Sequence, residues 1–286
     1  MGKYSSHEIA TRVGKARAAG WKHLNLSACE VQDQDLHEIL TEPGIEQLAS
    51  LDLFGNRLTA LPPQISRLAA LAALHLGINR LTALPPEIGQ LTALTDLYIL
   101  HNQLTALPPE IGQLAALTEL DLRGNRLTVL PPQIGQLTAL MSLYLQNNHL
   151  TGLTPEASRL IALKGLWLHG NGALGIPPEI LGPTWEEVQV RNASPASPAT
   201  ILDYYFRTRL AARPLNEAKM ILVGRGEVGK TSLVRRLLGK GFDPKQGKTQ
   251  GIQIAPWPLS LRPHEKVLLH IWDFGGQEIM HATHQF

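Results

Sequence analysis

Residues 224–232 have the composition and spacing of a loop that binds phosphate. They run Gly-Arg-Gly-Glu-Val-Gly-Lys-Thr-Ser and match the pattern G-x-x-x-x-G-K-[ST]. The apolar segment 218–223 predicts a strand before the loop, and 232–238 predicts a helix after it. Glycines let backbone N–H groups surround an anion, and the helix turns the positive end of its dipole toward it. The predicted phosphate-binding residues are Gly224, Arg225, Gly226, Glu227, Val228, Gly229, Lys230, Thr231 and Ser232.

Side chains from this loop and from a later segment have the chemistry that a nucleotide and its metal require. We expect Lys230 to reach the β- and γ-phosphates and the Thr231 hydroxyl to coordinate Mg²⁺. Residues 267–273 are apolar on both faces, which predicts a central parallel strand. This strand leads into a D-x-x-G segment, in which the Asp273 carboxylate can hold Mg²⁺ through water and the Gly276 N–H can meet the γ-phosphate.

The segments around these motifs predict the elements that position them. Pro256 and Pro258 make 252–261 an edge strand, and 262–266 has the composition of a hairpin turn. Earlier, the Pro- and Ser-rich loop 191–199 precedes a short amphipathic helix that Thr200 can cap, and we expect this helix to pack the two halves of the chain together. The apolar face of that helix contains Ile201, Leu202, Tyr205, Phe206 and Leu210.

The first half of the chain is a tandem repeat. Asparagines recur every 23 residues, each at the end of the pattern L-x-x-L-x-[LI]-x-x-N, which predicts a solenoid of leucine-rich repeats. The leucines enter the interior, and each asparagine is predicted to bind backbone groups where the chain leaves its strand. Paired prolines on the return side favour extended or 3₁₀ segments. The asparagines are Asn56, Asn79, Asn102, Asn125, Asn148 and Asn171, and the pairs begin at Pro62, Pro85, Pro108, Pro131 and Pro177.

Atypical units at both ends are expected to cap the array. Ser5 and Glu8 have the spacing of a capping box before a helix that ends near Gly20, and 185–190 keeps the strand pattern without a matching asparagine. The predicted organisation is therefore a helical cap at 1–21, repeats at 22–193, a linker with its helix at 194–214, and a phosphate-binding domain at 215–286.

Aromatic residues occupy outward positions of several predicted strands. Tyr98, Tyr144 and Trp167 would follow one another along the concave face of the solenoid. Two interpretations stay open: a docking surface for a protein or peptide, or rings that only cover one another.

Composition narrows the class of protein. The chain has 26 basic and 24 acidic residues and no run basic enough to indicate nucleic acid binding. A single cysteine, Cys29, excludes an internal disulfide, and neither a signal peptide nor an apolar run long enough for a membrane span is present. We therefore expect a soluble cytoplasmic protein.

The second half resembles the Roc domain of the Roco family, in which leucine-rich repeats precede a Ras-like GTPase domain. The resemblance rests on 215–219, on Thr249-Gln-Gly-Ile-Gln-Ile254, and above all on Trp272-Asp-Phe-Gly-Gly-Gln-Glu278 with 281–286. It implies GTP or GDP as ligand with Mg²⁺, and a COR domain for dimerisation in the complete protein. The fold class is then α/β: a repeat solenoid followed by a P-loop domain that ends after switch II.

The resemblance also assigns roles to single residues. Thr249 matches the switch I threonine that joins Mg²⁺ in the triphosphate state, although an ordinary loop threonine is the alternative. Phe242 matches an aromatic residue that packs on the guanine edge, with core packing as the alternative. Gln277 matches the switch II glutamine that orients the attacking water, which makes it the catalytic residue.

The family's guanine-recognition segments, [NT]-K-x-D and a later Ser-Ala-Lys-like run, do not occur in these 286 residues. We therefore expect a weakened nucleotide site in this chain. Three functions stay open: a GTP-hydrolysing switch, a repeat-based interaction module with an inactive nucleotide domain, and a signalling ATPase, which the D-x-x-G-Q arrangement disfavours.

Overall fold

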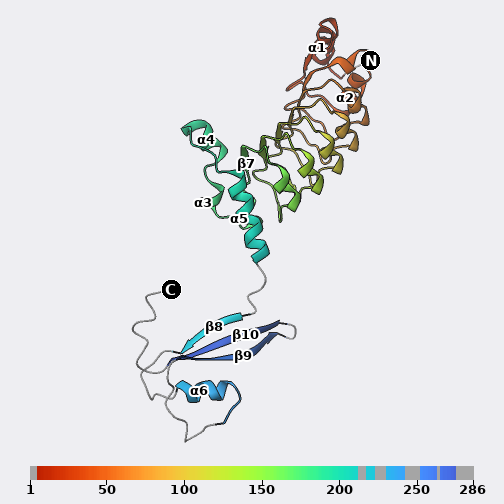
Figure 1. Ribbon diagram of the computed structural model, residues 1–286. Helices are drawn as coiled ribbons and strands as arrows, with labels where there is room; N and C mark the ends of the chain where they lie inside the picture. Colours follow the sequence, from red (N-terminus) through yellow and green to blue (C-terminus); the bar gives the residue numbers. More distant parts are fainter. Residues whose placement is uncertain (1–4, 212–216, 223–229, 242–251, 263–264, 275–286) are drawn as a thin grey trace. The chain divides into compact units, whose positions relative to one another are not determined.

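The computed structural model describes residues 5–211, 217–222, 230–241, 252–262 and 265–274 (Figure 1), and the chain divides into two compact units, Met1–Arg207 and Thr208–Phe286. None of the described helices is both long and apolar enough to span a bilayer.

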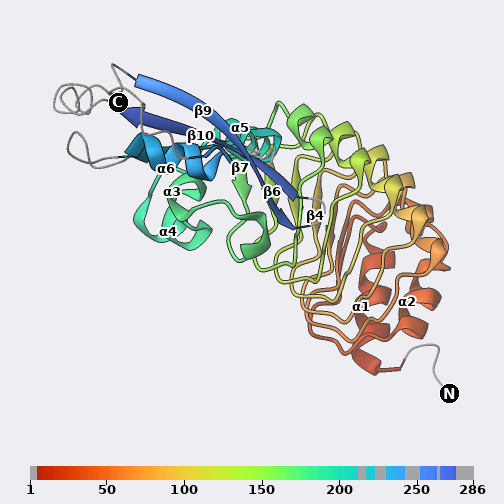
Figure 2. The same ribbon diagram turned by 90° about the horizontal axis from the view of Figure 1, so that it is seen from below.

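The first unit is a curved stack of coils with one strand in each coil. The strands form a seven-stranded parallel sheet in chain order, and the leucine at the centre of each strand lies opposite the leucine of the next. Short 3₁₀ helices line the other side of the stack (Figure 2). The strands are β1 (His23–Asn25), β2 (Ser50–Asp52), β3 (Ala73–His75), β4 (Asp96–Tyr98), β5 (Glu119–Asp121), β6 (Ser142–Tyr144) and β7 (Gly165–Trp167).

The return side of the coils confirms the prediction made from the proline pairs. Proline fixes φ and donates no hydrogen bond, so it suits the first position of a helix and not its interior. The last pair differs, because Pro177 precedes one turn of α-helix, α3 (Pro178–Leu181). The 3₁₀ helices are η1 (Ile45–Gln47), η2 (Pro63–Arg67), η3 (Pro86–Gln90), η4 (Pro109–Gln113), η5 (Pro132–Gln136), η6 (Pro155–Arg159) and η7 (Gly172–Leu174).

Buried asparagines join consecutive coils, as predicted. The Oδ1 atom of Asn102 accepts a hydrogen bond of 2.9 Å from the Leu81 N–H in the preceding coil. Its Nδ2 group donates to the Leu76 carbonyl at 2.9 Å and to the Ile99 carbonyl at 3.2 Å. Each asparagine thus satisfies backbone groups of two coils that would otherwise be buried without partners.

A helix caps the N-terminal end of the stack, although its capping residue differs from the prediction. Helix α1 spans His7–Ala18, and its N-cap is Ser6, whose Oγ accepts from the Ile9 N–H at 3.2 Å. Ser5 is instead held by Asp35 in α2 (Asp33–Leu40), to which its N–H and its Oγ–H both donate at 2.7 Å. The shift by one residue follows from this contact, because Asp35 uses both groups of Ser5.

The other end of the stack contradicts the predicted strand at 185–190. These residues form helix α4 (Trp185–Arg191), because Thr184 and Glu187 make a capping box at its start. Helix α5 (Pro198–Ala211) begins two residues before Thr200, so Thr200 does not cap it.

Helix α5 covers the last coils of the array. Ile201, Leu202 and Tyr205 are buried, and the Tyr205 hydroxyl accepts from the Leu153 N–H at 3.0 Å. These residues of the predicted apolar face therefore pack on the repeats, Leu210 lies outside the side chains that the structure describes, and a contact with the second unit stays a prediction.

The described part of the second unit is a three-stranded sheet with one helix against it. The order is β8–β10–β9, with β10 parallel to β8 and antiparallel to β9. The predicted central strand and the proline-containing edge strand are both confirmed within the described residues. Helix α6 packs against β10, and Val234 and Ile271 are buried. The elements are β8 (Glu217–Leu222), α6 (Lys230–Leu237), β9 (Ile252–Arg262) and β10 (Glu265–Phe274).

Candidate nucleotide site and concave surface

The predicted phosphate loop is framed by a strand and a helix. Strand β8 ends at Leu222 and α6 begins at Lys230, so the segment between them connects the carboxyl end of a strand to the N-terminus of a helix. This is the framework in which helix dipole and backbone N–H groups meet phosphate. Several predicted site residues lie outside the described residues: Gly224, Arg225, Gly226, Glu227, Val228, Gly229, Phe242, Thr249, Gly276 and Gln277.

Register places Asp273 at the same edge of the sheet as the end of β8. In the parallel pair β8–β10, Asp273 lies opposite Leu222, the last residue of β8. Ligands of open α/β sheets bind outside the carboxyl ends of the strands, where this edge lies. Lys230, Thr231 and Ser232 open α6, and all three are half-buried.

The donors at this edge have the chemistry of a magnesium site. A threonine hydroxyl and a carboxylate are the hard oxygen ligands that Mg²⁺ prefers, with waters and nucleotide phosphates completing its shell. Among the described residues, no group of three or more His, Cys, Asp or Glu could hold a metal ion. Thr231 and Asp273 are residue types that suit Mg²⁺, and their role as its ligands stays a prediction.

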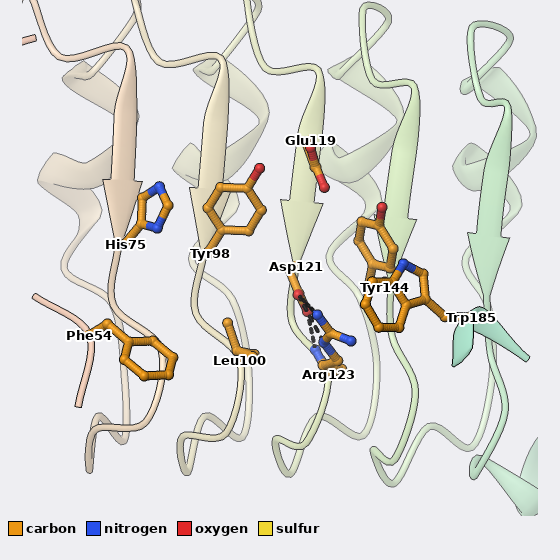
Figure 3. Close-up of a pocket in the computed structure, with 9 residues that line it drawn as sticks. All are labelled: Phe54, His75, Tyr98, Leu100, Glu119, Asp121, Arg123, Tyr144 and Trp185. Atoms are coloured by element: carbon orange, nitrogen blue, oxygen red, sulfur yellow. Dashed lines mark hydrogen bonds and ion pairs between the residues drawn. The ribbon is translucent and has the colours of Figure 1, made fainter. Parts of the chain in front are cut away.

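The concave face of the first unit contains a hollow of about 260 Å³ (Figure 3). Its walls come from β3 to β6, from the residues that follow β2, β4 and β5, and from the start of α4. It is lined by Phe54, His75, Tyr98, Leu100, Glu119, Asp121, Arg123, Tyr144 and Trp185.

Two of the three predicted concave aromatic residues are buried against each other. The rings of Tyr144 and Trp167 stack with centroids 4.5 Å apart and planes at 2°, and these residues are only 9% and 7% exposed. The Trp167 ring lies over Gly165, where a β-carbon would collide with it. For this pair, the interpretation in which the rings cover one another is confirmed, whereas Tyr98 is half-buried and packs on His75 with centroids 4.6 Å apart.

A buried ion pair forms one side of the hollow. The Asp121 carboxylate is almost completely buried, and it accepts hydrogen bonds from the Arg123 N–H at 3.1 Å and Nε–H at 2.9 Å. Burial raises the pKa of Asp121, and the hydrogen bonds and charge of Arg123 oppose that rise. The Arg123 guanidinium carbon lies 4.5 Å from the Trp185 ring centroid and 5.7 Å from that of Tyr144. The arginine is thereby held between a carboxylate and two rings.

Glu119 occupies the other side of the hollow, between Tyr98 and Tyr144 in Figure 3. Burial, followed by the neighbouring Glu119 carboxylate, raises the pKa of the Tyr98 phenol and that of the Tyr144 phenol. Among the described residues, no cation forms an ion pair with Glu119. The hollow thus combines a balanced ion pair with one further carboxylate.

Comparison with protein families identifies both halves of the chain. The family described as "Ras of Complex, Roc, domain of DAPkinase" matches residues 219–286, and a leucine-rich repeat family matches 46–104, 69–127 and 115–172. The chain joins leucine-rich repeats to a Roc segment, a Roco-like arrangement. The P-loop pattern, α6 and the sheet described above lie largely within the Roc segment.

Relatives of the Roc segment are of two kinds. A "Roc-COR-CHAT protease" of an unknown prokaryotic organism is 51% identical over 73 residues, which cover 22% of this chain and 7% of that protein. "Ras-related protein Rab-30" of Homo sapiens is 45% identical over 60 residues, covering 21% of this chain and 29% of that protein. The chain therefore spans a small part of the length of both relatives.

A solved structure supports the fold of the repeats. The leucine-rich repeat domain of the type III effector XCV3220 (XopL) has a TM-score of 0.51 and 29% identity, with 58% of each chain covered. This similarity covers the architecture of the first unit and assigns no ligand to its concave face.

Sequence reasoning found part of the hollow. The outward positions of the predicted strands place Asp121 and Arg123 on the concave face, but the pattern does not show that these two residues pair, and Glu119 on the same face was missed. Trp185 was missed for a different reason, because the predicted strand at 185–190 would have made it part of another coil.

Proposed function

We propose that this protein is a guanine-nucleotide switch of Roco type that hydrolyses GTP and carries a repeat surface for a protein partner. The observation that carries the proposal is the edge where β8 ends, α6 begins and Asp273 stands in register with Leu222. This edge lies in a segment that matches the Roc family and is similar to Rab proteins.

In this proposal, each residue around the edge has a separate role in phosphoryl transfer. Lys230 contacts the β- and γ-phosphates, and Thr231, Thr249 and Asp273 hold Mg²⁺, which neutralises phosphate charge when bound. Gln277 orients the attacking water. The remaining loop residues contribute backbone N–H groups, and loss of the γ-phosphate would release the segments of Thr249 and Gln277.

A nucleotide titration with the whole chain tests this function. We expect a fluorescent GDP analogue to bind weakly in the presence of Mg²⁺, because the guanine-recognition segments do not occur in these residues, and GTP to displace it. Lys230→Ala should abolish binding, because the point charge on the phosphates is lost. Lys240→Ala is the matched control, since Lys240 is an exposed lysine just beyond the end of α6.

Two results would contradict the proposal. Equal affinity of the Lys230→Ala and Lys240→Ala variants would remove the assigned role of the loop. Displacement by ATP that is stronger than displacement by GTP would favour the signalling ATPase instead. Phosphate release from GTP, measured with a Gln277→Ala variant beside the unchanged chain, separates hydrolysis from binding.

The alternative function is an interaction module in which the repeats supply the activity. The observation that favours it is the hollow on the concave face, which is formed entirely within the first unit. A chain that captures a protein partner equally well with and without bound nucleotide would support this alternative.

A further inference from the structure

We propose that the hollow on the concave face is a subsite for a lysine or arginine side chain of an extended peptide segment in a partner protein. The inference deepens the partner-binding part of the proposed function and rests on that part. It is carried by the charge of the concave face, the chemistry of the hollow and its size.

The concave face has an excess of negative charge. Neither lysine nor arginine occupies any position of strands β1 to β7, whereas acidic residues occupy four outward positions. The one arginine in the hollow, Arg123, is already paired with Asp121. A cationic partner would therefore gain attraction here, and an acidic one would be repelled. The acidic positions are Asp52, Asp96, Glu119 and Asp121.

The hollow already holds one cation in the manner proposed for the partner. Arg123 lies over the rings of Trp185 and Tyr144 while its guanidinium binds a carboxylate. On the other side, Glu119 supplies the carboxylate, and the rings of Tyr98 and Tyr144 flank it (Figure 3). An ammonium or guanidinium group can thus meet a charge and an aromatic face together, a combination that strengthens both contacts.

The dimensions favour a single side chain over a whole small molecule. The volume of about 260 Å³ is below the range of roughly 300–1,000 Å³ that is usual for small-molecule pockets. The hollow also opens on a sheet face, with Phe54, 39% exposed, among its lining residues. An extended backbone can cross this face while one long side chain enters, with its methylene groups on Phe54 and Leu100 and its charged end toward Glu119.

Binding of peptide pools to the immobilised whole chain tests the proposal. Each pool contains peptides of about nine residues, the length of a strand-like segment, randomised except for one fixed central residue. We expect the pools with central lysine or arginine to bind about tenfold more than the glutamine and leucine pools, as one charge-assisted aromatic contact would give. The pools with central aspartate or glutamate should bind least.

Two pairs of variants locate the effect. Glu119→Gln should remove the preference for lysine and arginine, whereas Glu110→Gln should keep it, because Glu110 lies in η4 on the return side of the preceding coil. Tyr98→Phe should keep the preference, since the ring remains, and Tyr98→Ala should weaken it.

Equal binding of the lysine and glutamine pools to the unchanged chain would overturn the proposal, and this comparison requires no variant to fold. A preference that survives Glu119→Gln would overturn it as well. So would self-association of the chain that Glu119→Gln abolishes, because the occupant would then be a second copy. Nucleotide affinity of the Glu119→Gln variant, measured alongside, should equal that of the unchanged chain, so failure of this subsite is distinguishable from failure of the switch.

Discussion

The repeat unit and the Roc segment place their functional residues on different kinds of structure. In the repeats, candidate contact residues stand on strands whose pairing is the same from coil to coil. In the Roc segment, the residues assigned to the nucleotide stand at strand ends, at a helix start and in the segments between them. The first arrangement gives a regular surface on which one side chain can differ from coil to coil, and the second depends on residues that come from several elements.

This comparison predicts that damage to the interior of the repeats leaves the nucleotide site unchanged. Asn102→Ala removes the acceptor of the buried Leu81 N–H. It also removes a donor to the Leu76 and Ile99 carbonyls, but each of these carbonyls keeps a hydrogen bond from the asparagine of a neighbouring coil. Because one N–H becomes unsatisfied and a cavity opens, we expect the free energy of unfolding of the repeats to fall by about 3 kcal/mol.

Hydrogen exchange of the whole chain measures this effect segment by segment. Exchange should accelerate in β3 to β5 and stay unchanged in β8 to β10, and nucleotide affinity should not move. Gln103→Ala is the control, because only its backbone N–H has a hydrogen bond to the neighbouring coil. Faster exchange in β8 to β10 would show that the two units are not energetically separate.

Helix α5 provides a second test of the comparison, because it covers the last coils of the repeats and precedes the Roc segment in the sequence. Tyr205→Phe removes the acceptor of the buried Leu153 N–H, so we expect a loss of about 1–2 kcal/mol in the unfolding free energy of the repeats. Asp203→Asn on the same helix breaks only an exposed ion pair with Arg207 and should cost less than about 0.5 kcal/mol. Urea unfolding followed by circular dichroism compares the two variants, and equal losses would contradict the role given to the hydroxyl.

The difference between the units also explains which parts of the structure could be predicted from the sequence. In the repeats, each leucine and asparagine has the same neighbours in every coil, so one pattern predicts the whole interior. In the Roc segment, the residues of the loop pattern are contiguous in the sequence, and Asp273 lies at the end of an apolar run that predicts a strand. Both predictions depend on contacts that are local or strictly periodic.

The failures occur where a local feature departs from the repeat. The capping box of Thr184 and Glu187 overrode a strand-like alternation at 185–190. Absence of a side chain at Gly165 let the Trp167 ring lie flat on its own strand and stack on Tyr144. Such outcomes depend on the space left by neighbours, which an outward position in a pattern does not specify.

The ion pair between Asp121 and Arg123 leads to the prediction with the smallest expected effect, a pH dependence of the stability of the repeats. Burial raises the pKa of Asp121 above its ordinary value of 3.8, so the folded state binds this proton more tightly than the unfolded state. The extra unfolding free energy from this proton is fully present below pH 3.8, and it is lost as the pH rises through the raised pKa of the folded state. The unfolding free energy of the unchanged chain, minus that of Asp121→Asn, should therefore fall as the pH rises from the ordinary pKa of Asp121 through its raised pKa.

Thermal unfolding of both chains at several pH values measures this difference. The comparison cancels the opposite contribution of Glu156 and Glu187, whose pKa values are lowered by hydrogen bonds from Thr154 and Thr184. If the difference rises with pH instead, attraction to Arg123 outweighs burial, and the guanidinium would hold Asp121 ionised in the folded state. Nucleotide affinity should be the same in both chains at each pH, because the titrating group belongs to the repeat unit and not to the Roc segment.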